Sequence, residues 1–129
     1  MEVKIDTREK FHVITIKESN FAANMTAELD NCLAPLLKSD VKNVILNMSD
    51  IQMMDDAASE YLVKIQQDFY EQNVSFVVCC LKLSVEEGLD ESGLLEIMNV
   101  TPSESEAWDI VQMEEIEREF LNGEEGPGL

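Results

Sequence analysis

Two adjacent carboxylates, Asp55 and Asp56, are the residues of this sequence best placed to do chemistry. They lie just before an amphipathic stretch that predicts a helix. A pair of carboxyl groups suits general acid–base catalysis when both share a pocket and one pKa is raised. An Asp at a helix start also caps the first turn and complements the helix dipole. Both interpretations, a small enzyme or carrier and a capped helix start, stay open at this point.

Other catalytic chemistry finds little support in the sequence. His12 is the one histidine, and it lies among apolar residues of a predicted strand, which favours a structural role over that of a general base. No Gly-rich loop follows a strand, so a nucleotide cradle is not expected. Neither a His-Glu-x-x-His motif nor a Cys/His cluster for zinc is present. We therefore predict no catalytic residue, no cofactor and no metal site.

The residues after the two carboxylates favour a protein contact. Ala57 and Ala58 are small, so a second protein could approach the backbone of this acidic helix start closely. Helix starts beyond the carboxyl ends of parallel strands are common places for sites in α/β sheets. We predict a partner-binding surface made of Asp55, Asp56, Ala57, Ala58 and Ser59.

Apolar periodicity predicts the elements that position this surface. Residues 3–5, 11–16, 44–46, 74–81 and 97–100 are predicted strands, and the apolar run at 74–81 suits a central strand. Helices are predicted over 25–38, with Asn24 as N-cap and a bend or early end at Pro35, and over 58–72 and 84–93. The last helix starts at Thr101 or Ser103 and has Ala107, Ile110, Val111, Met113, Ile116 and Phe120 as its apolar side. Helices that alternate with short strands predict an α/β sandwich with a mostly parallel sheet of about five strands and four helices.

Composition bounds the architecture and the partners. The chain has 129 residues, 45% hydrophobic and 28% charged, which is enough for one domain over residues 1–121 and a flexible acidic, Gly/Pro-rich tail at 122–129. The 27 Asp and Glu against 9 Lys and Arg give a net charge of −18. That charge argues against binding nucleic acid or an anionic membrane surface. No apolar run is long enough for membrane insertion.

The cysteines favour a reducing compartment. Three is an odd number, and Cys79 and Cys80 are neighbours in a predicted strand, where adjacent side chains point to opposite faces. Free, buried thiols are therefore expected, and with no signal peptide at the N-terminus a cytoplasmic location follows.

The order of these segments resembles the STAS domain, the fold of bacterial anti-sigma factor antagonists, over about residues 1–112. In that family a strand of the type Val-Leu-Asp-Leu-Ser leads through a hydrophobic residue to Asp-Ser-Ser-Gly and a helix. Here Val44-Ile-Leu-Asn-Met-Ser49 corresponds to the strand and Asp55-Asp56-Ala57-Ala58 to the motif. The late segments Val74–Leu81, Gly93-Leu94, Ile97–Val100 and Glu106-Ala107 follow the family order as well. The resemblance implies a STAS-like sandwich and places the loop from Ser19 to Asn24 beside the motif, which adds Asn24 to the predicted partner-binding residues.

The departures from the family pattern concern its switch. In phospho-regulated members the first Ser of the motif accepts a phosphoryl group from a partner kinase that is also the anti-sigma factor. Asp56 occupies that phosphoacceptor position here, and Asn47 replaces the strand Asp. Asp56 either imitates phosphoserine, with less charge and fewer oxygens, or is a helix-start residue in a protein without a switch. Ser59, one turn on, is a second candidate acceptor.

The resemblance implies a non-catalytic regulatory domain. Its expected partner is an anti-sigma factor of the serine kinase type or another regulatory protein. Two alternatives remain: a STAS subunit bound to a transporter ATPase of a lipid-trafficking system, and a structural or oligomerising domain that dimerises through Met53 and Met54.

Overall fold

The first two strands form an antiparallel hairpin at one edge of the sheet. Strand β1 (Val3–Thr7) pairs with β2 (Phe11–Ile16), and the pairing extends β1 two residues beyond its predicted end. His12 is buried in this hairpin. Its Nδ1 lies 2.8 Å from Thr7 Oγ1 and its Nε2 lies 2.7 Å from the Val41 carbonyl oxygen, so both ring nitrogens are used to fix structure.

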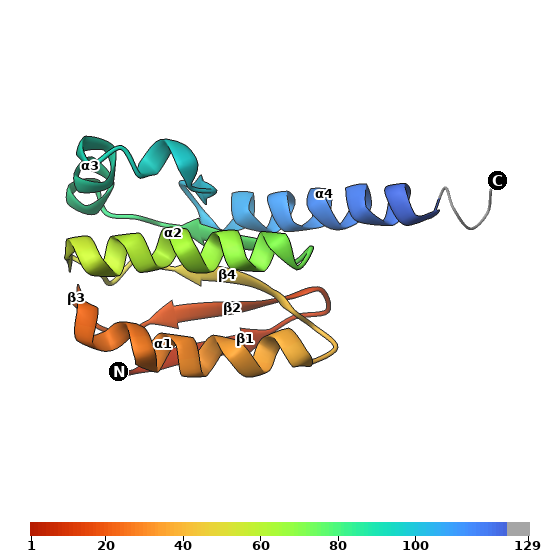
Figure 1. Ribbon diagram of the computed structural model, residues 1–129, viewed down its shortest axis with the longest axis horizontal. Coiled ribbons are helices and arrows are strands. Elements are labelled where there is room, and N and C mark those ends of the chain that lie inside the picture. Colours follow the sequence, from red (N-terminus) through yellow and green to blue (C-terminus); the bar gives the residue numbers. More distant parts are fainter. Residues whose placement is uncertain (124–129) are drawn as a thin grey trace.

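Three parallel strands complete the sheet. The computed structural model, which describes residues 1–123, gives the strand order β1-β2-β4-β6-β7 (Figure 1). Strands β4 (Asn43–Asn47), β6 (Phe76–Cys79) and β7 (Val100–Thr101) each add in parallel to the strand before them. The five-stranded mixed sheet with four α-helices confirms the predicted fold class, and β6 is buried along its whole length as expected.

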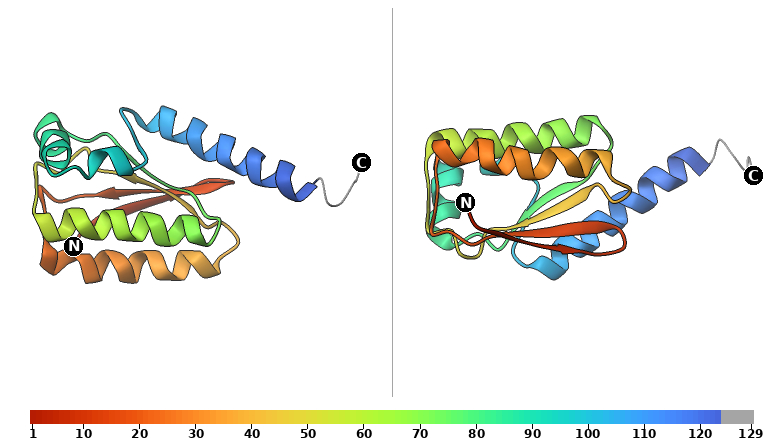
Figure 2. Two further views of the ribbon diagram at one scale, coloured as in Figure 1. Left: turned by 45° about the horizontal axis from the view of Figure 1, so that its top comes forward. Right: turned by 90° about the horizontal axis from the view of Figure 1, so that it is seen from below.

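Helices cover both faces of this sheet. Helices α1 (Thr26–Leu33) and α2 (Asp56–Glu71) lie on one face and α4 (Glu104–Gly123) on the other, as the right-hand view of Figure 2 shows. Helix α3 (Leu83–Glu91) packs near the start of α2, at the carboxyl ends of the parallel strands (Figure 1). Each face has its own core, because strand side chains alternate between the two faces.

The larger core lies under α1, α2 and α3. The rings of Phe69 on α2 and Phe76 on β6 meet edge to face with centroids 4.9 Å apart. The smaller core lies under the first half of α4 and joins Ala107 and Val111 to Phe11, Val13, Ile45, Val77 and Cys79. The first half of α4 is thus part of the folded core.

A buried glutamine links the larger helical layer to the sheet. The side chain of Gln66 on α2 donates to the carbonyl oxygens of Phe76, at 2.8 Å, and Asn99, at 3.0 Å. Its Oε1 accepts from the Asn99 backbone N–H at 2.9 Å. Gln66 therefore fixes the position of α2 relative to β6 and to the segment that leads into β7.

The first helix region differs in detail from the prediction. Residues 25–38 comprise the last residue of a 3₁₀ turn (Ala23–Met25), then α1, then a second 3₁₀ segment (Ala34–Lys38). The change at Pro35 confirms the predicted early end, since proline cannot donate to the carbonyl four residues earlier. The prediction of Asn24 as N-cap is wrong: Met25 is the N-cap residue of α1 and Asn24 lies inside the first 3₁₀ turn.

Other differences lie in short segments. Two strands of two residues each, β3 (Asn20–Phe21) and β5 (Met53–Met54), pair with one another and were not predicted. The strand predicted at 97–100 exists but is shorter and begins later, because Leu95–Ile97 is a 3₁₀ turn and β7 begins at Val100. Such segments are too short for apolar periodicity to identify them.

The end of β6 corrects the expectation for the two cysteines. Cys80 has a φ of 66°, so the chain leaves the extended conformation there, and the Cys79 and Cys80 sulfur atoms lie 3.5 Å apart on one side. All three cysteines are free thiols, but only Cys79 is fully buried, and its burial raises the pKa of that thiol.

The last helix begins at Glu104, so the second of the two predicted starts is correct. Ser103 Oγ accepts from the Glu106 backbone N–H at 3.3 Å and donates to the Glu106 carboxylate at 2.7 Å. The helix reaches Gly123, so it includes the first two residues of the predicted tail, and 124–129 lie outside the described residues. The predicted apolar side is only partly correct, because Met113, Ile116 and Phe120 are exposed.

Candidate functional site

Asp55 holds two segments together at the start of α2. It is the N-cap residue: its Oδ1 accepts from the Ala58 backbone N–H at 2.8 Å. Its Oδ2 accepts from the backbone N–H of Ala23 at 3.0 Å. These two backbone hydrogen bonds, first that from Ala58, lower the pKa of the Asp55 carboxyl group. A lowered pKa is opposite to what a general acid requires, so the acid–base interpretation gains no support here.

The loop before α1 lies beside this helix start, as the resemblance implied. The pairing of β3 with β5 is extended by hydrogen bonds from the Gln52 and Met53 N–H groups to the Ser19 carbonyl oxygen, at 2.6 and 3.1 Å. The Asp55 N–H donates to the Phe21 carbonyl oxygen at 3.3 Å. The two loops therefore form one surface at the carboxyl ends of the strands.

The predicted partner-binding residues divide into exposed and buried groups. Asp55, Asp56, Ala57 and Asn24 are exposed. Within residues 1–123 the Asp56 carboxylate makes no hydrogen bond or ion pair, in contrast to Asp55. The expectation that Ala58 and Ser59 lie on the surface is wrong, and both are buried.

Ser59 is buried on the side of α2 that faces α3, where it lines a hollow between the two helices. Its hydroxyl donates to the Asp55 carbonyl oxygen at 2.9 Å, which closes the first turn of the helix. A phosphoryl donor would have to reach a hydroxyl that is 7% exposed and already hydrogen-bonded. This geometry does not favour the hypothesis that Ser59 is an alternative acceptor.

A shallow hollow of about 280 Å³ lies next to Asp56, between the start of α2 and α3. Met53 lines this hollow and is 67% exposed, and Leu83, the first residue of α3, is 70% exposed. Ser84 Oγ donates to the Gln52 carbonyl oxygen at 3.4 Å and joins α3 to this surface. The sequence pointed to Met53 as an apolar contact but gave no signal for Leu83, because a single exposed Leu at a helix start has no distinctive pattern.

The residue that replaces the expected strand Asp has a structural role. Asn47 Oδ1 accepts from the Ser49 N–H at 2.9 Å, and its Nδ2 donates to Glu104 at 3.1 Å. Asn47 thus shapes the turn after β4 and connects it to the start of α4. An Asp here would bring a second carboxylate against Glu104, whereas the amide donates to it.

The described residues contain no group of three His, Cys, Asp or Glu side chains arranged to hold a metal ion. No helix among them is long and apolar enough to cross a lipid bilayer. Within residues 1–123, the helix start offers one unpaired carboxylate, Asp56, beside the small Ala57 side chain and the exposed apolar side chain of Met53. That combination suits recognition of another protein's surface.

Comparisons with known proteins identify relatives of this fold. The family model of the STAS domain matches residues 2–107. A Ser-to-Glu variant of RsbS from Moorella thermoacetica has a similar structure, with a TM-score of 0.72 and 19% identity over 87% of this chain and 96% of that chain.

Two further solved structures are similar. A STAS-domain anti-sigma factor antagonist from Planctomyces limnophilus has a TM-score of 0.72 and 15% identity over 85% of this chain and 97% of its own. The phosphorylated form of SpoIIAA from Bacillus has a TM-score of 0.62 and 14% identity over 85% and 99%. At such identities the likeness concerns the fold. A comparison with curated protein sequences found no match.

Proposed function

Because this chain belongs to the STAS domain family, we propose that it is a non-catalytic regulatory domain of the anti-sigma factor antagonist type, which binds its partner through the start of α2. The binding surface consists of Asp55, Asp56 and Ala57, with Asn24 and Met53 at its margins. The observation that carries the proposal is that the two neighbouring carboxylates have different hydrogen-bonding environments. Asp55 is used to build the helix start, whereas Asp56 has no hydrogen-bond or ion-pair partner among residues 1–123.

The proposal includes the absence of a serine switch at this position. Asp56 stands where phospho-regulated relatives have their acceptor, and the nearest hydroxyl on α2, that of Ser59, is buried. Asp carries one charge, against about −1.5 to −2 for phosphoserine, so it imitates the phosphorylated state only in part. We therefore propose constitutive binding, with Asp56 as an ordinary member of the surface. SpoIIAA from Bacillus, which has a similar fold, has been solved in a phosphorylated form.

The test is affinity capture from a lysate of the source cells with the wild-type protein, Asp56→Ser and Asp56→Ala as baits. Constitutive binding predicts that all three recover the same anti-sigma factor or serine kinase-like protein, with a lower yield for the two variants because they lack the presented carboxylate. Capture by Asp56→Ser alone would instead make Asp56 a built-in off state. Recovery of a transporter ATPase would favour the alternative in which the domain is a transporter subunit.

A fourth bait locates the surface. Ala57→Arg places a long charged side chain at the point of closest approach and is expected to abolish capture. Ala27→Arg is the matched control, because Ala27 is also an exposed helical alanine but lies on α1. Equal loss with both substitutions, or no loss with either, would contradict the assignment of this surface.

A further inference from the structure

In the second half of α4 the charged residues face the protein and the apolar residues face outward, the reverse of the usual arrangement. Helix α4 continues to Gly123, well past residue 107 where the family match ends, and projects beyond the body of the domain (Figure 1). In a surface helix the apolar side normally faces the protein. Here the side chains that face the body are Glu114, Glu115 and Arg118, and those that face away are Met113, Ile116 and Phe120.

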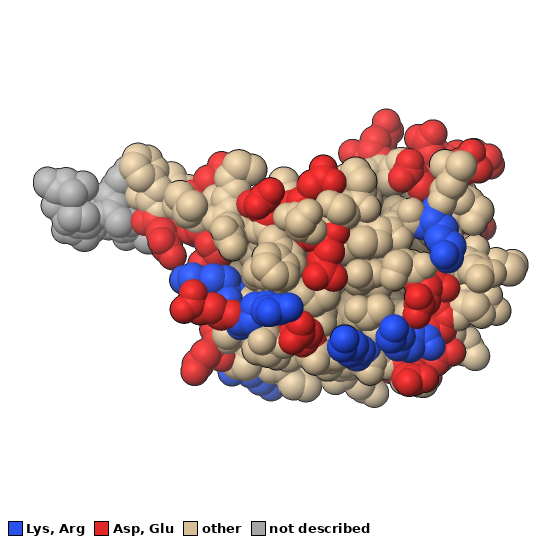
Figure 3. Space-filling view, turned by 180° about the vertical axis from the view of Figure 1, so that it is seen from behind, with Lys and Arg blue, Asp and Glu red and all other residues tan. Residues whose placement is uncertain are grey.

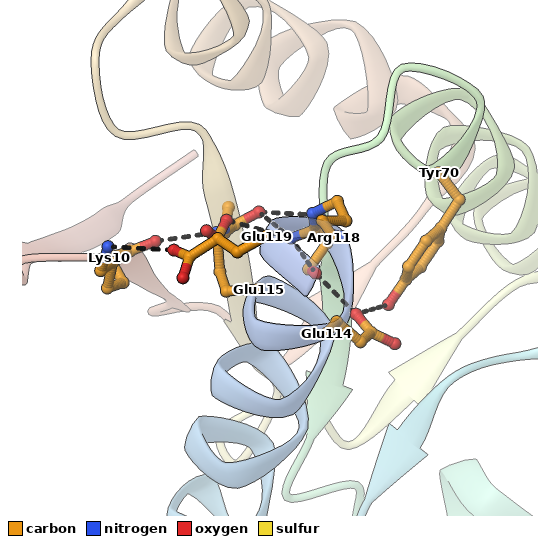
Figure 4. A network of polar contacts seen from close by, with 8 residues as sticks. Lys10, Tyr70, Glu114, Glu115, Arg118 and Glu119 are labelled. Carbon is orange, nitrogen blue, oxygen red and sulfur yellow. Dashed lines mark hydrogen bonds and ion pairs between the residues drawn. The ribbon is translucent and has the colours of Figure 1, made fainter. Parts of the chain in front are cut away.

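The inner side of this half is held by a polar network (Figure 4). Arg118 donates to Glu115 at 3.1 Å and to Ser75 Oγ at 3.0 Å, and Ser75 donates to Glu114 at 2.6 Å. Asn43 donates to Glu115 at 2.7 Å. These contacts attach the helix to the N-terminal ends of β4 and β6.

Further bonds extend the network to α2 and to the first hairpin. Tyr70 donates its hydroxyl proton to Glu114 at 2.7 Å, and Lys10 lies 3.8 Å from Glu119. Desolvation of Glu115 opposes its ionisation, but the hydrogen bonds from Asn43 and Arg118 prevail and lower its pKa. The helix is therefore fixed in rotation, and its outer side cannot turn inward without breaking these contacts.

The outer side carries a short coiled-coil pattern, which we name the outer seam: Met113, Ile116 and Phe120. These side chains are 53%, 65% and 66% exposed. Their spacing of three and then four residues is that of successive core positions in a heptad repeat. Exposed apolar groups of this size that lie together mark an interaction site.

Beside the seam lies a hollow of about 520 Å³ that widens the apolar surface. It is formed by Phe120 and Leu121 together with Tyr70, and Glu114, Glu117 and Arg118 rim it. Leu121 is 64% exposed. A partner seated on the seam would find room here for one large side chain.

The charges beside the seam favour a basic partner over an acidic one. In the heptad, Glu117 and Glu119 take the two flanking positions that face a partner helix, and α4 as a whole has seven acidic residues and one basic residue. Two copies of this helix packed along the seam would place these carboxylates against each other, within a chain whose net charge is −18. Figure 3 views the molecule from the side of α4: Lys and Arg lie mostly in the lower part of this face, interspersed with Asp and Glu, and Asp and Glu predominate in the upper part.

We propose that the outer seam of α4 docks an amphipathic helix of a second protein whose flanking positions carry Lys or Arg. Packing of the apolar core positions supplies affinity, and the opposite charges set partner choice and orientation. This surface lies on the opposite face of the sheet from the start of α2, so the inference does not depend on the proposed function.

The experiment uses three synthetic helical peptides of about four heptads as probes. The first has Leu at core positions and Lys at flanking positions, the second has Glu at the flanking positions, and the third is a scrambled version of the first. Binding to the full chain is measured by fluorescence anisotropy at physiological salt. The expected result is binding of the first peptide at least about tenfold tighter than of the other two.

Variants assign this binding to the seam. The triple variant Met113→Ser, Ile116→Ser, Phe120→Ser is expected to bind the first peptide no better than the scrambled one. The matched control Met53→Ser, Leu83→Ser removes exposed apolar groups elsewhere and is expected to bind as the wild type does. Circular dichroism of both variants checks that α4 remains helical. Equal binding of the first peptide by the triple variant and the wild type would overturn the proposal.

Two further measurements test the charge preference of the seam and the possibility of a dimer. Glu117→Lys is expected to weaken the Lys peptide and strengthen the Glu peptide, each by roughly two- to fivefold, which a merely structural role of Glu117 would not produce. Sedimentation of the wild type should show a monomer. A dimer that the triple variant abolishes would overturn the proposal in favour of a second copy of this chain.

Discussion

At the start of α2, Asp55 and Asp56 carry the same carboxyl group in two different environments. The first accepts two backbone hydrogen bonds, from Ala58 and Ala23, and the second accepts none within residues 1–123. Asp55 thus stabilises the surface, whereas its neighbour Asp56 is exposed on it. Substitution of Asp55 should therefore affect the stability of the fold, and substitution of Asp56 should affect partner capture.

Asp55→Ala should lower the midpoint of thermal unfolding, because it leaves the Ala58 N–H at the first turn of α2 without its cap and frees Ala23. Asp56→Ala is the matched control and should leave the midpoint almost unchanged. The measurement is thermal unfolding followed by circular dichroism. Equal midpoints for the two variants would contradict the structural role of Asp55.

The same pair predicts a pH dependence. The pKa of Asp55 in the folded protein lies below its ordinary value of 3.8, so its contribution to stability is present above that value and is lost as pH falls through the folded pKa. The difference in unfolding midpoint between wild type and Asp55→Ala should therefore be present at neutral pH and decrease as the pH falls below 3.8. A difference that persists unchanged in acid would contradict this explanation.

Among the elements, α2 depends on Gln66 as well as on apolar packing. Gln66→Leu keeps a side chain of similar size but leaves the Asn99 N–H without its partner in the interior, and should lower the free energy of unfolding by about 1–3 kcal/mol. Gln67→Leu is the matched control, since Gln67 is exposed on the same helix. Urea unfolding measures both, and a similar effect of the two substitutions would contradict the role given to Gln66.

The elements also show how far the sequence alone could be interpreted. The strands at 11–16 and 44–46 and the helix at 58–72 have clear periodicity and dense apolar residues, and the structure confirms them. The pairing of β3 with β5 was not predicted, because a strand of two residues is defined only by its partner. The paired residues Asn20 and Met53 are 33 positions apart in the sequence. Tertiary contact, which the local sequence does not contain, creates such elements.

The candidate site was predictable in place but not in detail. The acidic pair after a buried strand identified the helix start, and the resemblance placed the Ser19–Asn24 loop beside it. The burial of Ala58 and Ser59 depends on the rotation of α2 on the sheet, which periodicity gives only to within a residue. The residues of the outer seam were predicted to be buried for a related reason. Periodicity shows which side of a helix is apolar, but it does not show whether the rest of the protein is long enough to cover that side.

At the scale of the whole molecule, the sheet separates two surfaces. The start of α2 lies with the larger core, and the outer seam lies on α4 across the sheet (Figure 2). We expect the two to act independently, since no described side chain belongs to both. Ala57→Arg should leave binding of the Lys peptide unchanged, and the triple seam variant should leave capture of the α2 partner unchanged. Anisotropy and capture measure the two cases, and a loss of both functions in either variant would indicate coupling or misfolding.

The strand order β1-β2-β4-β6-β7 follows the order of the chain, so no strand has to enter between two that are already paired. During synthesis each new parallel strand can join the open edge left by the one before it. The start of α2 and its loop contacts are complete before residue 104 is made, whereas Phe11, Val13, Ile45 and Val77 have no cover until α4 arrives. The α2 surface therefore needs no residue of α4, whereas the second face of the sheet is shielded only when α4 docks, so the docking of α4 closes the fold.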